Sequence, residues 1–198
     1  MSSIAQLLAS YPRVRPELPP AQARIYEEQY KVNREGAHAI EGLAQRLERW
    51  MHRQVARIPG GPILELGAGT LNHVQYEAPG VAYDVVEPFR ALYAGRPEAA
   101  RVRNFHDSVA QIADDEQYAR VISVAVLEHM DDLPREVAQA ALHLTPNGVF
   151  QAGIPSEGGF LWWLGWRCST GLSYYLRTGH DYGRLMRHEH LNTAPEIL

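Results

Sequence analysis

A glycine turn behind a carboxylate is the most informative feature of this chain. Residues 63–70 read Ile-Leu-Glu-Leu-Gly-Ala-Gly-Thr, an apolar run that ends at Gly67 and Gly69, with Glu65 two positions before the first glycine. A buried parallel strand that turns sharply into a helix has this pattern. The glycines allow a ligand close to the backbone, and the helix expected next offers free N–H groups. Asn72 replaces the third glycine of the dinucleotide fingerprint. The preceding carboxylate disfavours a pyrophosphate and favours a cationic ligand.

A second acid lies where a nucleoside could be held. Glu87 ends the next predicted strand, about twenty residues beyond the glycine turn, and Pro88 follows it. An ionised carboxylate only accepts hydrogen bonds, so it matches the two donor hydroxyls of a ribose. The alternative is an acid that merely ends a strand before a proline turn.

The glycine turn and two later motifs resemble the class I S-adenosylmethionine-dependent methyltransferases. Glu-Leu-Gly-Ala-Gly-Thr at 65–70 resembles their first motif, Leu-Glu-His at 127–129 resembles the end of their fourth strand, and residues 144–148 resemble the Leu-x-Pro-x-Gly turn before their fifth. S-adenosylmethionine carries a sulfonium and an ammonium, which suits the charge of Glu65. The resemblance is firm over residues 63–154 and weak on either side.

The resemblance also implies which residues hold the cofactor. Asp107, with Ser108 beside it, is the candidate for the adenine amino group, although either residue could instead cap a helix. Arg34 could hold the methionine carboxylate, although a solvated helix face is the more common explanation for such a residue. The cofactor-binding residues expected are Glu65, Gly67, Ala68, Gly69, Glu87, Pro88, Asp107, Ser108, Val126 and Arg34.

Histidines are the candidates for catalysis. His129 follows the fourth predicted strand, and as a general base it could take a proton from a hydroxyl acceptor. The alternative is a histidine that holds its loop by hydrogen bonds. His188 and His190 lie where the resembling family places its acceptor, and they compete for the same role. The His-Glu-His run lacks the i, i+4 spacing of a zinc helix, so no metal site is expected.

The surrounding pattern predicts an α/β fold that positions these groups. A Rossmann-like, mostly parallel sheet flanked by helices is expected, with an N-terminal helical cap. The terminal antiparallel hairpin of the resembling family is expected to be absent, because the sequence ends where a last helix begins. We expect an arm and cap over 1–58 and a core over 59–198, within one compact domain. Strands are predicted at 63–66, 81–86, 102–105, 121–126 and 149–154, helices within 21–58 and at 89–95 and 133–144, and a turn at 145–148.

Composition limits the classes of partner. The 198 residues carry 19 basic and 23 acidic side chains, a net charge of −4, which argues against a nucleic-acid partner. No apolar run is long enough for a membrane span, and the single cysteine fits a reducing, cytoplasmic setting. The aromatic cluster Trp162, Trp163 and Trp166 could be core, a lid over the acceptor, or a contact with a membrane surface or with the second subunit of a homodimer.

We therefore predict a methyltransferase that uses S-adenosylmethionine and releases S-adenosylhomocysteine. The acceptor is expected to be a small molecule, with methylation at oxygen of a saccharide-like or other hydroxyl compound. One alternative is a catalytically silent S-adenosylmethionine-binding module that acts through a partner. The other is a nicotinamide-dependent oxidoreductase, which Glu65 and the missing third glycine disfavour.

Overall fold

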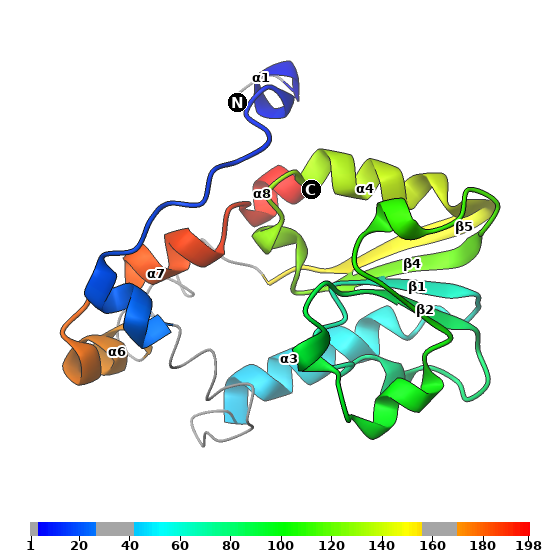
Figure 1. Ribbon diagram of the computed structural model, residues 1–198, viewed down its shortest axis with the longest axis horizontal. Coiled ribbons are helices and arrows are strands. Elements are labelled where there is room, and N and C mark those ends of the chain that lie inside the picture. The colour runs from blue at the N-terminus through cyan, green and yellow to red at the C-terminus, as the bar shows by residue number, and fades with distance from the viewer. Residues whose placement is uncertain (1–3, 27–41, 156–169) are drawn as a thin grey trace. The chain divides into compact units, whose positions relative to one another are not determined.

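The computed structural model divides the chain into two compact units. It describes residues 4–26, 42–155 and 170–198 (Figure 1). The first unit, here the sheet unit, comprises residues 42–127 and 133–154. The second, here the terminal unit, contains the described residues 4–26, 128–132, 155 and 170–198. The predicted division into 1–58 and 59–198 stays a prediction.

A five-stranded parallel sheet forms the centre of the sheet unit and confirms the predicted fold class. The strand order is β3-β2-β1-β4-β5, with β1 in the middle (Figure 1). Every strand pair runs parallel, and Ile63 of β1 aligns with Tyr83 of β2 and Arg120 of β4. The strands are β1 (Ile63–Leu66), β2 (Tyr83–Val86), β3 (Asn104–His106), β4 (Tyr118–Val124) and β5 (Leu144–Gly153).

Apolar, β-branched sequence explains the central strands. All four residues of β1 and of β2 are buried, as a parallel strand covered on both faces requires. Two α-helices belong to this unit, α3 (Gly42–Val55) and α4 (Leu133–Leu142). Met51 and Val55 of α3 pack against the core cluster, which includes Ile63 and Ile122. The core thus fixes the strand ends where ligands bind in open α/β sheets.

Two local predictions were wrong. The glycine turn does not lead into an α-helix but into a short 3₁₀ helix, η1 (Val74–Tyr76). Leu71 has a φ of 63°, a left-handed conformation that a right-handed helix cannot include. The turn predicted at 145–148 lies inside β5 as a bulge, because Leu144 already pairs with Tyr118 and Val149 pairs with Arg120.

The segments that connect β1, β2, β3 and β4 also contain less helix than predicted. The helical turns in these connections are all 3₁₀: η1, η2 (Arg90–Leu92), η3 (Pro97–Arg101) and η4 (Val109–Gln111). The predicted helix at 89–95 is therefore reduced to η2. The helix predicted from residue 133 is confirmed as α4.

The terminal unit is built from short helices. They are α1 (Ile4–Leu8), a helical stretch over residues 20–26, α6 (Thr170–Thr178), α7 (Tyr182–Glu189) and α8 (Ala194–Ile197). Asp181 caps α7 by accepting a hydrogen bond from the Gly183 N–H at 2.9 Å, and Thr193 and Glu196 form a capping box on α8. In the part of the chain that the structure describes, no helix is long and apolar enough to cross a membrane.

Some predicted features lie outside the described residues. These are Arg34, the helix break expected at Gly36 and the tryptophan cluster at 162–166.

Candidate cofactor site and candidate catalytic histidines

The glycine turn needs both of its glycines, for different reasons. Gly67 has a φ of 67°, and a Cβ there would lie 2.4 Å from Cγ1 of Val126. Gly69 has a φ of 50°, but a Cβ there would meet no atom of the described residues within 4 Å. Gly67 is thus required by packing and conformation together. Gly69 is required by conformation alone and leaves open space above the backbone.

Backbone hydrogen bonds align the ends of the first three strands. The Gly67 N–H donates to the Val86 carbonyl at 2.8 Å, and the Glu87 N–H donates to the His106 carbonyl at 2.8 Å. The glycine turn, Glu87 and the residues after β3 therefore occur at one edge of the sheet. This is the carboxyl edge, where open α/β sheets bind their ligands.

Glu87 is buried and holds the backbone on either side of it. One carboxylate oxygen accepts the Gly69 N–H at 2.8 Å, and the other accepts the Phe89 N–H at 2.9 Å. A carboxylate offers about four acceptor positions, so each oxygen retains capacity for another donor. The side chain is only 5% exposed in the chain alone. Pro88, next to it, is exposed.

Glu65 lies beneath the turn, in the middle of β1. Its side chain is buried and accepts a hydrogen bond from the Tyr83 hydroxyl at 2.7 Å. Burial raises the pKa of Glu65 to about 7, and the charges of Glu77 and Glu87 act in the same direction. A nearby cation would favour the ionised form of this carboxyl.

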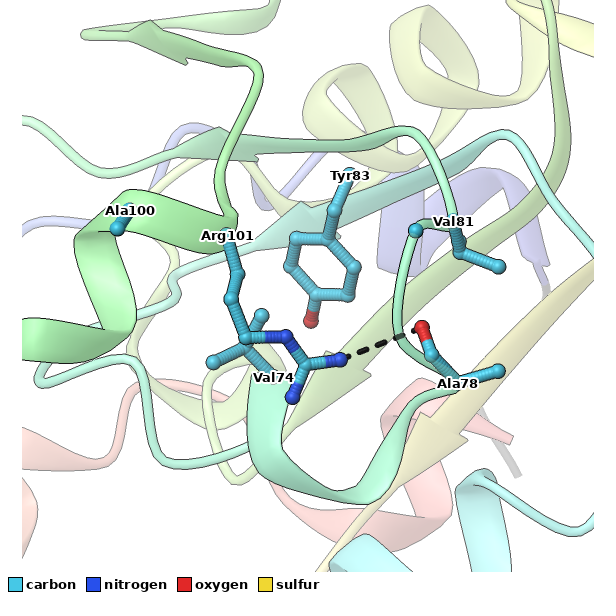
Figure 2. Close-up of a pocket in the computed structure, with 7 residues that line it drawn as sticks. Val74, Ala78, Val81, Tyr83, Ala100 and Arg101 are labelled. Carbon is cyan, nitrogen blue, oxygen red and sulfur yellow. Dashed lines mark hydrogen bonds between the residues drawn. The ribbon is translucent and has the colours of Figure 1, made fainter.

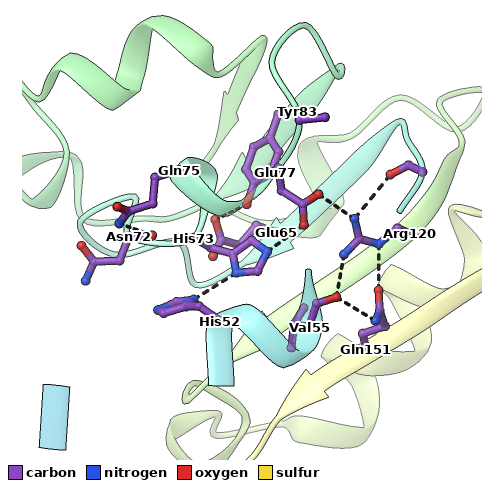
Figure 3. A network of polar contacts seen from close by, with 12 residues as sticks. His52, Val55, Glu65, Asn72, His73, Gln75, Glu77, Tyr83, Arg120 and Gln151 are labelled. Carbon is purple, nitrogen blue, oxygen red and sulfur yellow. Dashed lines mark hydrogen bonds and ion pairs between the residues drawn. The ribbon is translucent and has the colours of Figure 1, made fainter. Parts of the chain in front are cut away.

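A buried polar network adjoins Glu65 and extends to β4 (Figure 3). The Nδ1 atoms of His52 and His73 lie 3.0 Å apart, and Nε2 of His73 lies 2.9 Å from Oε1 of Glu77. Arg120 donates to the other Glu77 oxygen at 2.8 Å and to Oε1 of Gln151 at 2.7 Å. The network joins α3, the segment after the glycine turn, β4 and β5.

Burial and pairing set the ionisation of this network. Burial lowers the pKa of His73, so its neutral form is favoured. Burial works against ionisation of Glu77, but the hydrogen bonds from His73 and Arg120 outweigh it and the pKa of Glu77 falls. None of the residues of this network was among the site residues predicted from the sequence. The available signal was Arg120, a charge directly before an apolar strand run, which requires a partner once buried.

Asp107 and Ser108 follow β3 at the same sheet edge. Ser108 occupies the N-cap position of η4, but its side chain makes no capping hydrogen bond. Asp107 is exposed, its N–H donates to Oε1 of Gln111 at 2.7 Å, and its carboxylate accepts from Gln111 at 3.4 Å. Phe105 stacks on Tyr93 with ring centroids 4.5 Å apart. The Asp107 carboxylate therefore faces solvent with acceptor capacity to spare.

The three candidate histidines belong to the terminal unit. His129 and His190 contact each other edge to face, with ring centroids 4.7 Å apart. Nδ1 of His129 lies 2.8 Å from the Glu189 carbonyl, and Nδ1 of His188 lies 2.6 Å from the Pro16 carbonyl. A carbonyl only accepts, so Nδ1 carries the proton in both rings and Nε2 of a neutral ring keeps its lone pair.

Within the described ranges, no cluster of three or more metal-ligating side chains occurs.

The described site residues fall into two groups, the candidate catalytic histidines in the terminal unit and the candidate cofactor residues in the sheet unit. Arg34 lies outside those ranges, and the other predicted cofactor residues all belong to the sheet unit: Glu65, Gly67, Ala68, Gly69, Glu87, Pro88, Asp107, Ser108 and Val126.

A separate cavity of about 230 Å³ lies beside the start of β2 (Figure 2). Val74, Val81 and Tyr83 contribute to its lining, and Arg101 donates to the Ala78 carbonyl at 3.2 Å beside it. The start of a parallel strand is at the sheet edge opposite the glycine turn. None of the predicted site residues lines this cavity.

Comparison with known proteins identifies the family. Residues 37–193 match the methyltransferase domain family, and the chain belongs to it. No curated protein sequence matches the chain.

Several solved structures of methyltransferases resemble the chain at low sequence identity. One is an amino pentose methyltransferase from Micromonospora echinaspora, 21% identical, covering 64% of this chain and 54% of its own, with a TM-score of 0.42. Another is the CcbJ methyltransferase from Streptomyces caelestis, which is 21% identical over 59% of this chain and 51% of its own length, with a TM-score of 0.45. A third is an S-adenosylmethionine-dependent methyltransferase from Thermotoga maritima, which is 20% identical over 72% of this chain and 70% of its own length, with a TM-score of 0.49. The chain spans about half the length of the first two structures.

Proposed function

We propose that this chain binds S-adenosylmethionine at the glycine turn and transfers its methyl group to a small-molecule acceptor. Membership of the methyltransferase domain family supports the reaction class. When bound, the cofactor supplies a methyl group activated on a sulfonium. The role of the chain is to hold that group, orient an acceptor and exclude water, since positioning supplies much of the rate in such reactions.

The carboxylate of Glu87 is the observation that carries the proposal. Its two oxygens each accept one backbone N–H, from Gly69 and Phe89, which fixes the carboxylate plane beside the glycine turn. Each oxygen can accept one further donor, and a ribose presents two adjacent hydroxyls. The open space above Gly69 admits the nucleoside close to the backbone.

Other residues are assigned to the remaining parts of the cofactor. Asp107 would accept from the adenine amino group, with Ser108 beside it, and Arg34 would hold the methionine carboxylate. Glu65 would favour the cationic end of the cofactor over a pyrophosphate. Ala68, Pro88 and Val126 would shape the walls of the same site.

We propose a hydroxyl as the methyl acceptor, on a saccharide-like or related compound. A hydroxyl must lose its proton as the new bond to carbon forms, and a positioned imidazole can take it. The Nδ1–H of His129 is held by the Glu189 carbonyl, which leaves Nε2 as the basic atom. His188 has the same proton placement and competes for the role, as does His190. A cytoplasmic location and a homodimer also remain predictions.

Binding and transfer should be measured separately. Titration calorimetry with S-adenosylhomocysteine and with a nicotinamide dinucleotide tests the ligand class. Methyl-labelled S-adenosylmethionine, offered with a panel of hydroxyl and amine compounds, tests the transfer and the methylated atom. Binding without transfer to any acceptor would favour a silent binding module. A folded protein that ignores both S-adenosylmethionine and S-adenosylhomocysteine at millimolar concentration would refute the proposal.

The substitution Glu87→Gln tests the ribose contact. A glutamine amide has one acceptor oxygen and one donor nitrogen. Only one of its two terminal atoms can therefore accept hydrogen bonds from a backbone N–H and a ribose hydroxyl. We expect the affinity for S-adenosylhomocysteine to fall roughly 10- to 100-fold, as for hydrogen bonds to a charged group. Asp115→Asn removes an exposed carboxylate of the same unit and should leave the affinity unchanged. Equal affinity of the two variants would remove Glu87 from the site.

A further inference from the structure

The segment over residues 11–16, here the strap, joins parts of the terminal unit that are far apart in sequence. The Arg13 N–H donates to the Asp131 carbonyl at 2.8 Å, and the Tyr11 hydroxyl donates to Oδ1 of Asn192 at 2.7 Å. Arg13 also forms a two-pronged ion pair with Glu196, at 2.7 and 3.0 Å, and donates to the Leu191 carbonyl. The strap is therefore tied both to residues 128–132 and to the segment after α7.

Arg15 makes the contacts that converge on the candidate histidines. Its Nη1 donates to the carbonyls of His188 at 2.7 Å and Glu189 at 3.2 Å. Its Nη2 donates to the His129 carbonyl at 2.9 Å and to the Asp131 carboxylate at 3.2 Å. One guanidinium thus links the end of α7 to the residues around His129. A guanidinium is suited to this role, because its donors have a fixed planar arrangement.

One carbonyl connects Arg15 directly to the orientation of the His129 ring. The Glu189 carbonyl accepts from Arg15 and also lies 2.8 Å from Nδ1 of His129. The position of this carbonyl decides which ring nitrogen carries the proton. Arg15 holds the carbonyl and, through the His129 backbone carbonyl, the residue that carries the ring. Arg15 therefore contacts both partners of the hydrogen bond from Nδ1 of His129: the acceptor carbonyl of Glu189 and the backbone of His129 itself.

We propose that Arg15 is a positioning residue that sets the ring orientation and proton placement of His129. This inference rests on the proposed function only in giving His129 a catalytic task. Without Arg15, the Glu189 carbonyl and the His129 backbone each lose one of the contacts that hold them, and the population of the second tautomer rises. A ring with its proton on Nε2 presents a donor where a base needs a lone pair.

Residues 128–130 have attachments that do not involve Arg15. The N–H groups of Leu191 and Asn192 donate to the Glu128 carbonyl at 2.7 and 3.0 Å, and the Asn192 side chain donates to the Met130 carbonyl at 2.7 Å. Substitution of Arg15 leaves these bonds in place. We therefore expect the terminal unit to remain folded in such variants.

The test is the tautomer of His129, read by NMR of protein labelled with ¹⁵N-histidine. The ring signals are assigned with His129→Gln, and spectra are recorded at a pH where the ring is neutral. The wild type should show the Nδ1–H form of His129. In Arg15→Met, the proportion of the Nε2–H form should rise about fivefold, the effect of losing one net hydrogen bond. Arg15→Lys keeps the positive charge but lacks the planar guanidinium, and it should give an intermediate ratio of the two tautomers. If Arg15→Met does not fold, Arg15→Lys takes its place.

The control is Arg24→Met, which removes an exposed guanidinium from the helical stretch over 20–26 of the same unit. It should leave the tautomer as in the wild type. Unchanged tautomer ratios in folded Arg15→Met would refute the positioning role, whatever the protein binds. Failure of the wild type to bind S-adenosylhomocysteine would refute the proposed function and leave the tautomer result standing, so the two failures can be told apart.

Discussion

Gly67 and Gly69 lie in one turn, yet the residues around them make the cost of substituting each glycine unequal. Both have positive φ, which costs a residue with a side chain about 1–2 kcal/mol. Only Gly67 also lies against another side chain, that of Val126. No atom of the described residues fills the space above Gly69, which we expect a ligand to use.

Alanine substitutions should therefore separate stability from binding. Gly67→Ala should lower the free energy of unfolding by roughly 3 kcal/mol or more, because overpacking against Val126 adds to the conformational cost. Gly69→Ala should lower it by only about 1–2 kcal/mol and should weaken S-adenosylhomocysteine binding at least tenfold. Urea unfolding and calorimetry measure the two effects. Equal losses of stability would show that Val126 moves aside at no cost.

At the level of single residues, the sequence predicted the glycines and Glu87 at the sheet edge where the structure has them. Their positions follow from strand ends, which apolar runs mark clearly. The bonds that Glu87 makes to Gly69 and Phe89 could not be predicted. They depend on side-chain orientation, and the sequence gives no measure of it. For the same reason, the buried pair of His73 and Glu77 could not be predicted.

Among the elements, strands β2, β3 and β4 are joined by a buried acid. Asp84 of β2 is fully buried and accepts from Arg103 at 2.6 and 2.9 Å and from the Tyr118 hydroxyl at 2.7 Å. Burial disfavours the charge, but the bonds from Arg103 and Tyr118 outweigh it and lower the pKa of Asp84. The side chain of Asn104 in β3 also donates to Asp84 at 3.3 Å, so the acid ties this edge strand to the centre of the sheet.

The substitution Asp84→Ala should destabilise the sheet unit strongly. It leaves Tyr118 and Arg103 without their common acceptor, and breaking a buried pair typically costs about 3–5 kcal/mol. We expect the lower end of that range, since the Arg103 side chain is 39% exposed and can be solvated. Guanidinium unfolding measures the change. The exposed Asp115→Ala should stay within about 0.5 kcal/mol of the wild type, and a similar result for Asp84 would contradict this account.

Strands were easier to predict than the connections between them. The run Val-Ile-Ser-Val in β4 has only one reading, because β-branched residues buried on both faces favour a parallel strand. The glycine turn suggested a helix, but Leu71 adopts a left-handed conformation that nothing in its residue type indicates. Residues 145–148 include a proline and a glycine, as turns commonly do. Because Leu144 pairs with Tyr118, these residues form a bulge within β5. Pairing partners are distant in sequence, so local patterns cannot reveal them.

For the whole molecule, the raised pKa of Glu65 predicts a characteristic pH dependence of stability. The folded state holds a proton on Glu65 up to about pH 7, whereas an unfolded chain releases it near 4.5. Stability from this group is therefore complete below about 4.5 and is lost as the pH rises through 7. The shift corresponds to roughly 3 kcal/mol. His73 acts in the opposite sense, since its lowered pKa costs stability as the pH falls below its usual value near 6.5.

The substitution Glu65→Gln isolates the first effect. Its free energy of unfolding, relative to the wild type, should rise by about 3 kcal/mol between pH 4.5 and pH 8, because the amide has no charge to bury. Urea unfolding of both proteins across this range measures the difference, in which the contribution of His73 cancels. A difference that stays constant with pH would mean that Glu65 is ionised throughout.

The ties between the strap and the last helices have a consequence for the order of events during synthesis. Arg13 and Glu196 are separated by 183 positions, and Tyr11 and Asn192 by 181. Contacts this distant close late, because the intervening chain must be ordered first. A ribosome-bound chain can pair β1 with β2 long before residue 192 emerges. The contacts that surround His129 can therefore form only after residues 188–192 have been synthesised, whereas the strands of the sheet are available earlier.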